Sequence, residues 1–406
     1  MTKTIHETVE NEFDIVLNVD ESAELSSDDE VAQKRRDNTL PAWIDKEDDQ
    51  KIQPYVPLFE EQPDESEDEE IGPNFISISS KYDDIKRVKI KRSNFANIER
   101  PARSEITSVD FNKKFELLLN TSIDTSLSVF KVDEKQCELV KDVVFEKFPI
   151  HSAKFLNCGE KILMSSQDSP YLRIYNLDTQ TETRSTKLLE NDEKIIDFAI
   201  PSRSQNQIAV GTSSGRIIVT DLRTLDKSHV LYSSGSINSI AYSDDDQLIG
   251  SGTDNGEVFI YSNNKLSSRW KDHGNYKEIT KLTFSPNSRW IACGSYSGIV
   301  NMYNLVDTTS NDSPTPIKVF DQLKQSISSC VFSNDNRMLF ISSKLDKGSY
   351  RLLNMNYFSP FENFPLHRGL EESASSCCFS PNNRFMCVGL KNGRSVMYCL
   401  DKYKNY

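Results

Sequence analysis

The sequence predicts an all-β fold, a seven-bladed β-propeller that follows a largely disordered acidic N-terminal tail. A pattern of three short strands recurs seven times, and the first strand of each copy ends at an apolar residue: Phe111, Phe155, Ile200, Tyr242, Phe284, Phe332 and Phe379. These positions are separated by 44, 45, 42, 42, 48 and 47 residues. A repeat of this length with several strands per unit is typical of a propeller. Such a ring presents docking surfaces, so the pattern favours assembly over catalysis.

The acidic tail is expected to span residues 1–80. Residues 1–75 contain 23 acidic and 6 basic side chains, whereas the rest of the chain contains 38 acidic and 42 basic ones. Acidic runs repel themselves, and the short apolar islands near Val19, Trp43 and Tyr55 are too few to offset the chain entropy. We therefore expect disorder, in which the islands are either random sequence or short linear motifs that become ordered on a partner.

The propeller is expected to span residues 81–406 and to need one strand from its N-terminal side. The seventh copy ends at Leu400, and the six residues that follow are too few for a turn and a fourth strand. Residues 85–91 alternate apolar and basic side chains, as in a half-buried strand. We expect a strand near residues 85–92 to complete the last blade and remove an open sheet edge. The candidate contacts with RNA or a protein partner are its basic residues, Lys86, Arg87, Lys89, Lys91 and Arg92. The alternative for this basic stretch is a nuclear-import signal.

Within each copy, turn-forming residues separate the predicted strands. Ser285-Pro286-Asn287 and Ser380-Pro381-Asn382 follow first strands. The glycines that precede third strands are expected to supply the positive φ of tight hairpins; they are Gly215, Gly256, Gly298, Gly348 and Gly393. These residues have structural roles.

Motifs for catalysis or metal binding are missing from the sequence. It contains no phosphate-binding loop and no His-Glu-x-x-His. Residues 211–215 match Gly-x-Ser-x-Gly, but they lie in a predicted hairpin between two strands and not between a strand and a helix, so no nucleophile elbow is expected. The eight cysteines form no Cys-x-x-Cys and are expected to be buried, reduced core residues. We expect no enzyme activity, no cofactor and no metal. Because no apolar run approaches the ~20 residues that span a bilayer, and the N-terminus lacks a signal-peptide core, we expect no membrane partner.

The repeats resemble degraded WD repeats. The Gly-His dipeptides of that pattern are missing. Its Trp-Asp ends are replaced by Tyr175-Asn176, Thr220-Asp221 and Tyr303-Asn304.

Several local stretches resemble the U3 small nucleolar RNA-associated protein 18 family in sequence and in order along the chain. They are Pro41 to Asp45, Lys89 to Arg92 with Ala96-Asn97 and Ile106 to Phe111, Ser295 to Asn304, Phe361 to Pro365, and Phe379 to Tyr403.

This resemblance implies a non-catalytic scaffold subunit of the small-subunit processome. Such a subunit serves ribosomal RNA precursor processing and small ribosomal subunit biogenesis in the nucleolus. The implied partners are other propeller subunits of the UtpB subcomplex and the processome, the backbone of U3 RNA or precursor ribosomal RNA, and the nuclear exosome RNA helicase. The alternative is a WD-repeat adaptor of another class, either a ubiquitin-ligase substrate receptor or a chromatin-associated scaffold.

The resemblance also implies two tail motifs. The family's motif for the arch domain of the helicase reads roughly Leu-Phe-any-Val/Ile-Asp, and its best match here has leucine in place of phenylalanine: Val16, Leu17, Asn18, Val19 and Asp20. Two apolar side chains would fill a pocket while Asp20 pairs with a cation. The second candidate docking motif is Pro41, Ala42, Trp43, Ile44 and Asp45.

Overall fold

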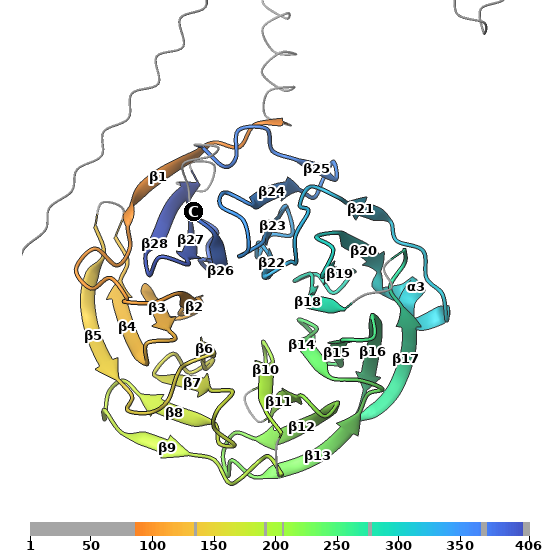
Figure 1. Ribbon diagram of the computed structural model, residues 1–406, viewed down its shortest axis with the longest axis horizontal. Coiled ribbons are helices and arrows are strands. Elements are labelled where there is room, and N and C mark those ends of the chain that lie inside the picture. Colours follow the sequence, from red (N-terminus) through yellow and green to blue (C-terminus); the bar gives the residue numbers. More distant parts are fainter. Residues whose placement is uncertain are drawn as a thin grey trace, which may run out of the picture. The chain divides into compact units, whose positions relative to one another are not determined.

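A computed structural model of the 406-residue chain describes residues 86–400, apart from 134–135, 191–192, 205–206, 275–277 and 367–371. Within these residues, seven antiparallel sheets of four strands each surround a common axis (Figure 1). We call the sheets blades 1 to 7, in the order of their innermost strands. The seven-bladed all-β propeller predicted from the repeats is confirmed.

Each blade contributes one strand to each of four concentric positions. The innermost strands are β2 (Ile106–Phe111), β6 (Ser152–Phe155), β10 (Ile195–Ala199), β14 (Ile237–Tyr242), β18 (Ile279–Phe284), β22 (Ser329–Phe332) and β26 (Ala374–Phe379). The second strands are β3 (Leu117–Ser122), β7 (Lys161–Ser165), β11 (Gln207–Thr212), β15 (Leu248–Thr253), β19 (Trp290–Ser295), β23 (Met338–Ser342) and β27 (Phe385–Leu390). The third strands are β4 (Ser126–Lys131), β8 (Arg173–Asn176), β12 (Arg216–Asp221), β16 (Glu257–Ser262), β20 (Val300–Asn304), β24 (Tyr350–Asn354) and β28 (Ser395–Leu400). The outermost strands are β5 (Glu138–Val144), β9 (Glu182–Arg184), β13 (Lys227–Tyr232), β17 (Lys265–Lys271), β21 (Lys318–Phe320), β25 (Ser359–Pro360) and, for blade 7, β1 (Ile90–Phe95).

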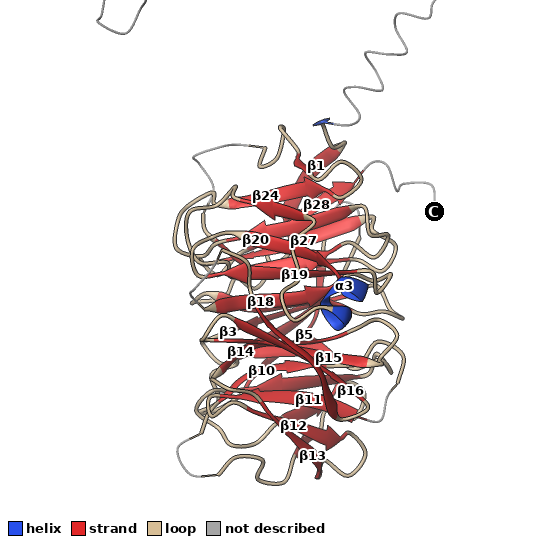
Figure 2. Ribbon diagram, turned by 90° about the vertical axis from the view of Figure 1, so that its right-hand side faces the viewer, coloured by secondary structure: helices blue, strands red, loops and turns tan. Residues whose placement is uncertain are grey.

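Burial follows the position of a strand in its blade. Second strands lie between neighbouring blades on both faces, and all of β23 is buried. Outermost strands border solvent, and all of β9 is exposed. Near-continuous apolar runs therefore mark the inner strands, and polar residues mark the rim. Figure 2 shows the ring edge-on, with the loops gathered at its two faces and helix α3 (Leu305–Ser310) beside blades 4 and 5.

The ring closes through β1, which pairs antiparallel with β28. Ile90 lies opposite Leu400, and Arg92 lies opposite Tyr398. We expected the closing strand near residues 85–92, but the paired strand begins at Ile90 and ends at Phe95. Within the described residues, the pairing runs from Ile90 opposite Leu400 to Phe95 opposite Val396. Residues before Ile90 bond instead to the loop that follows β25.

The hairpin between β27 and β28 needs glycine at its tip. Gly393 has φ +80°, and a Cβ atom there would lie 2.2 Å from the carbonyl oxygen of Ala102. The same backbone approach lets the Ala102 amide donate to the Gly393 carbonyl at 3.0 Å. Glycine is therefore required at this position both for the turn and for contact with the segment between β1 and β2.

A buried polar network joins blades 4 and 5. Asp272 is 4% exposed and accepts hydrogen bonds from the Tyr303 hydroxyl at 2.6 Å and the Asn301 amide at 3.0 Å. The Tyr303 oxygen also accepts from the His273 backbone amide at 2.8 Å. Tyr303 stands where WD repeats carry tryptophan, so the degraded repeat keeps a buried aromatic and adds a hydroxyl that serves a buried carboxylate.

Candidate functional site

Two of the sequence-predicted motifs lie outside the described residues. These are residues 16–20, the candidate helicase motif, and residues 41–45, the candidate tail docking motif. Both stay predictions.

The predicted basic segment forms an exposed stripe on the outer edge of blade 7. Lys86, Arg87 and Lys89 precede β1, whereas Lys91 and Arg92 lie on it, and all five side chains are exposed. Between them, Val88 is half-buried and Ile90 is buried. The alternating pattern thus sorts apolar side chains inward and basic ones outward, where a partner can reach them.

Partners within the ring orient some of these basic side chains. The Lys86 ammonium lies 3.2 Å from a carboxylate oxygen of Glu362. The Arg92 guanidinium lies 5.3 Å from the centroid of the Phe95 ring. Exposed ion pairs and cation–π contacts of this kind contribute little to stability.

Two asparagines hold the ends of this segment to the ring. The Asn363 side chain accepts from the Val88 amide at 3.0 Å and donates to the Val88 carbonyl at 2.7 Å. Asn97 donates to the Gly393 carbonyl at 2.8 Å and accepts from the Ser395 amide at 2.9 Å. In the sequence, both asparagines stand out only because they lie in stretches that resemble the family, and no structural role could be predicted for them. Their physical role is to satisfy backbone groups at the closure, which we call the ring seam.

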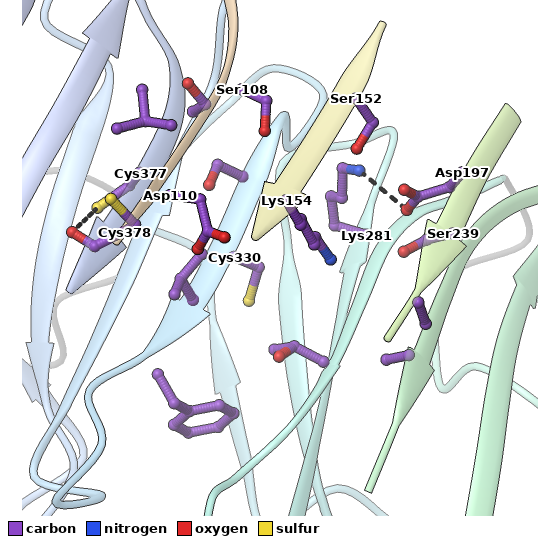
Figure 3. A pocket seen from close by; sticks show the side chains of 18 of the residues that line it. Ser108, Asp110, Ser152, Lys154, Asp197, Ser239, Lys281, Cys330, Cys377 and Cys378 are labelled. Atoms are coloured by element: carbon purple, nitrogen blue, oxygen red, sulfur yellow. Dashed lines mark hydrogen bonds and ion pairs between the residues drawn. The ribbon is translucent and has the colours of Figure 1, made fainter. Parts of the chain in front are cut away.

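The central channel is the other concave site, with a volume of about 620 Å³. The innermost strands line it with small polar side chains and a few charged ones (Figure 3). Lys281 of β18 reaches Asp197 of β10 across the intervening blade, with 3.4 Å between the ammonium and a carboxylate oxygen. Ser108 donates to the Ala153 carbonyl at 2.7 Å. These contacts join one blade to another, so the channel wall is chiefly structural.

Asp110 has the most perturbed carboxylate on the channel wall among the described residues. It accepts a hydrogen bond from the Phe155 amide at 2.8 Å, and Figure 3 shows it near Lys154. Burial raises the pKa of Asp110 to about 6, although the Phe155 amide and the Lys154 and Lys113 ammonium groups act in the opposite direction. A carboxyl that is partly protonated near neutral pH can donate as well as accept a hydrogen bond.

This perturbed group makes folding depend on pH. The folded ring holds the Asp110 proton more tightly than the unfolded chain, so the stabilisation is fully present below about pH 4 and is lost as the pH rises through about 6. Asparagine does not titrate, so Asp110→Asn should not lose this stability as the pH rises. The free energy of unfolding of Asp110→Asn, relative to that of wild type, should therefore increase by about 2 kcal/mol from pH 4 to pH 7. Urea titrations at the two pH values would measure it. The exposed Asp178→Asn is the control, and equal pH profiles for Asp110→Asn and wild type would contradict this assignment.

Six of the eight cysteines are buried, as expected, whereas Cys158 and Cys399 are half-buried. Burial raises the pKa of Cys330, which lines the channel, to about 12, and that of Cys137 to about 11. Their thiols stay protonated at neutral pH and act as small apolar side chains. Within the described part of the chain, no group of three or more His, Cys, Asp or Glu side chains could hold a metal ion. Every helix in that part is too short or too polar to cross a membrane.

Asp124 lies in the turn between β3 and β4 and accepts hydrogen bonds from two backbone amides. Asp124 accepts from the Ser126 amide at 3.1 Å and from the Arg103 amide at 2.7 Å. Burial by itself would raise the pKa of Asp124. The hydrogen bonds from these amides and from the Ser126 and Ser122 hydroxyls outweigh burial and lower that pKa. The residue thus holds a turn and the segment before β2, a structural role.

Comparison with known families identifies the repeat. The family model described as "WD domain, G-beta repeat" matches residues 220–262 and 264–304. Each match includes the outermost strand of one blade and the three inner strands of the next, β13 to β16 and then β17 to β20. A sequence repeat staggered in this way leaves the last blade one strand short, which β1 supplies.

The chain is also similar to several curated proteins with one name. It is 27% identical over 338 residues to the U3 small nucleolar RNA-associated protein 18 homolog of Mus musculus, covering 82% of this chain and 60% of that protein. It is 28% identical over 313 residues to the Arabidopsis thaliana homolog, covering 76% of this chain and 57% of that protein. For the Saccharomyces cerevisiae protein of that name, the identity is 27% over 327 residues, covering 69% of this chain and 55% of that protein. The aligned part thus spans about 60% or less of these relatives' length. The chain is a WD-repeat β-propeller protein, and its resemblance to the U3 small nucleolar RNA-associated protein 18 family is confirmed over most of its length.

Proposed function

We propose that this chain is a non-catalytic scaffold subunit of the small-subunit processome, acting in ribosomal RNA precursor processing and small ribosomal subunit biogenesis in the nucleolus. The observation that supports this most directly is the similarity, over 82% of the chain, to a protein named for its association with U3 small nucleolar RNA. The ring adds a physical rationale. The contacts described in the strands, turns and channel hold the blades together, so we assign partner binding to the exposed surfaces of the ring.

The basic stripe is the proposed contact for other UtpB propeller subunits or for the backbone of U3 or precursor ribosomal RNA. Its side chains are exposed and lie along one strand edge, a geometry that suits successive phosphates better than a base-reading pocket. Phosphate contacts release counterions, so RNA binding through this stripe should weaken steeply as salt is raised.

Sedimentation of the tagged protein from nuclear extract tests the proposed function. The protein is expected in large particles that also contain U3 RNA. Its absence from those particles would contradict the proposal. Co-purification dominated by cullin-type or histone partners would support the other class of WD-repeat adaptor.

The tail motif gives a separable prediction about the exosome RNA helicase. Replacing Leu17 and Asp20 together by alanine should reduce helicase capture by tenfold or more, on the order of 1–2 kcal/mol for the lost apolar anchor and carboxylate. Entry into the large particles should be unchanged. The same tail offers a control, Val31→Ala with Asp37→Ala, which removes one apolar and one acidic side chain outside the motif. Helicase capture that is equal in both double variants would reject the motif.

A further inference from the structure

A small pocket lies where blade 7 meets blade 1, at the turns between their first and second strands. Its volume is about 180 Å³, below the several hundred Å³ of sites for drug-sized ligands. The apolar side chains that line it are Phe111, Phe115, Val132, Pro381 and Phe385. A space of this size and character accommodates one large apolar side chain. We call it the seam pocket.

The walls of the seam pocket are preformed. Phe111, Val132 and Phe385 are between 5% and 9% exposed and belong to one buried cluster. Phe115 is 50% exposed, and its ring lies so close to Gly159 of blade 2 that a Cβ atom there would come within 3.1 Å of it. The aromatic wall is therefore supported from behind and open in front, which lowers the entropy cost of binding.

Polar groups around the pocket are already engaged. Asn112 donates to the Gly159 carbonyl at 2.6 Å and accepts from the Lys114 amide at 2.9 Å. The Ser380 hydroxyl donates to Asn382 at 2.8 Å and accepts from the Phe385 amide at 2.9 Å. A nucleobase would leave its own polar edge poorly matched here, whereas an apolar side chain would not.

Basic side chains lie at this pocket: Lys114 lines it, and Arg384 precedes the lining residue Phe385. The Lys114 side chain is exposed and has no hydrogen-bond or ion-pair partner within the described ring, and Arg384 of blade 7 lies with its guanidinium 5.4 Å from the Phe385 ring centroid. Lys113 is directed elsewhere, donating to Asn157 of blade 2 at 3.2 Å. Glu116 is the one carboxylate among the lining residues. The rim therefore favours acidic residues on either side of the apolar anchor.

We propose that the seam pocket is a docking site for an acidic peptide segment of a protein partner, which inserts one aromatic or large aliphatic side chain between blades 7 and 1. This goes beyond the proposed scaffold function. Because the binding is measured on the purified protein, its outcome is independent of whether the chain enters ribosomal precursor particles.

A fluorescently labelled peptide with one tryptophan between aspartates is the probe, with binding followed by anisotropy. Saturable binding is expected, and alanine in place of the tryptophan should weaken it about tenfold or more. In the protein, Phe115→Ala should weaken binding about tenfold and Lys114→Glu about threefold to fivefold. The matched controls are Tyr357→Ala, an aromatic 57% exposed on blade 6, and Lys161→Glu, an exposed lysine on blade 2; both should bind like wild type.

Three results would overturn the proposal. The first is the absence of saturable binding at about 1 mM peptide. The second is peptide binding that is equal in Phe115→Ala, Lys114→Glu and the controls. The third is tighter, Phe115-dependent binding of a single-stranded oligouridylate, which would make the pocket an RNA site. Lys114→Glu alters a surface residue and keeps the test decisive even if Phe115→Ala perturbs the fold.

Discussion

Phe364→Ala should lower the free energy of unfolding by about 3–5 kcal/mol. Phe364 is fully buried between blades 6 and 7. Its ring centroid lies 5.5 Å from those of Tyr350 and Tyr398, and 6.4 Å from that of Phe340, in edge-to-face contacts. Alanine would leave a cavity among three aromatic rings that belong to different strands and cannot close in together.

Urea or thermal unfolding would measure this loss. Tyr357→Ala removes another aromatic of blade 6, which is 57% exposed, and should change the stability by less than about 0.5 kcal/mol. A loss below about 1 kcal/mol in Phe364→Ala would show that the cluster collapses around the smaller side chain and does not hold the blades together.

The fold could be predicted from the sequence because each blade has the same pattern of buried strand ends and tight turns. Strand ends such as Phe284 and Phe332 recur at nearly constant spacing and are buried at equivalent positions. Gly298 and Gly393 precede third strands and adopt positive φ, as the hairpins require. Local periodicity and turn chemistry are sufficient to recognise such elements.

Contacts between distant parts of the chain could not be predicted in the same way. Asn363 and Val88 are separated by 275 positions, and nothing in the local sequence of either shows that they bond. The predicted bounds of the closing strand, residues 85–92, follow the apolar and basic residues of 85–91, whereas the described pairing joins Ile90–Phe95 to β28. Pairing register depends on both strands, and the sequence pattern described only one of them.

The seam pocket was missed for a related reason. Phe115 and Pro381 each read as ordinary turn residues of their own copies, and they line one space only because the first and last blades are neighbours in the closed ring. A weak local signal existed, since Phe115 is an aromatic in a turn where the other copies carry polar residues or glycine. An exposed aromatic in a turn can indicate a binding site.

Removing β1 should destabilise the ring more than any other change at the seam. A chain that begins at residue 96 lacks Ile90, which is 8% exposed within the cluster between blades 6 and 7. It also leaves the outer edge of β28 without a hydrogen-bonding partner. We expect a loss of at least about 3 kcal/mol from the apolar surface alone. Self-association is also expected, because an open edge pairs with other chains.

A chain that begins at Lys86 is the matched control, since it retains β1 and the Asn363 contact with Val88. Size-exclusion chromatography and thermal unfolding should show a monomeric, cooperative ring for this control, and aggregation or a lower melting temperature for the shorter chain. Ile90→Asp tests the same point in the full chain, because it places a carboxylate in the apolar cluster while the strand backbone stays in place. If both the shorter chain and Ile90→Asp matched the control, the ring would be stable as six complete blades and one blade of three strands. In that case β1 would not be needed for stability, and its role would be to hold the basic stripe at the surface.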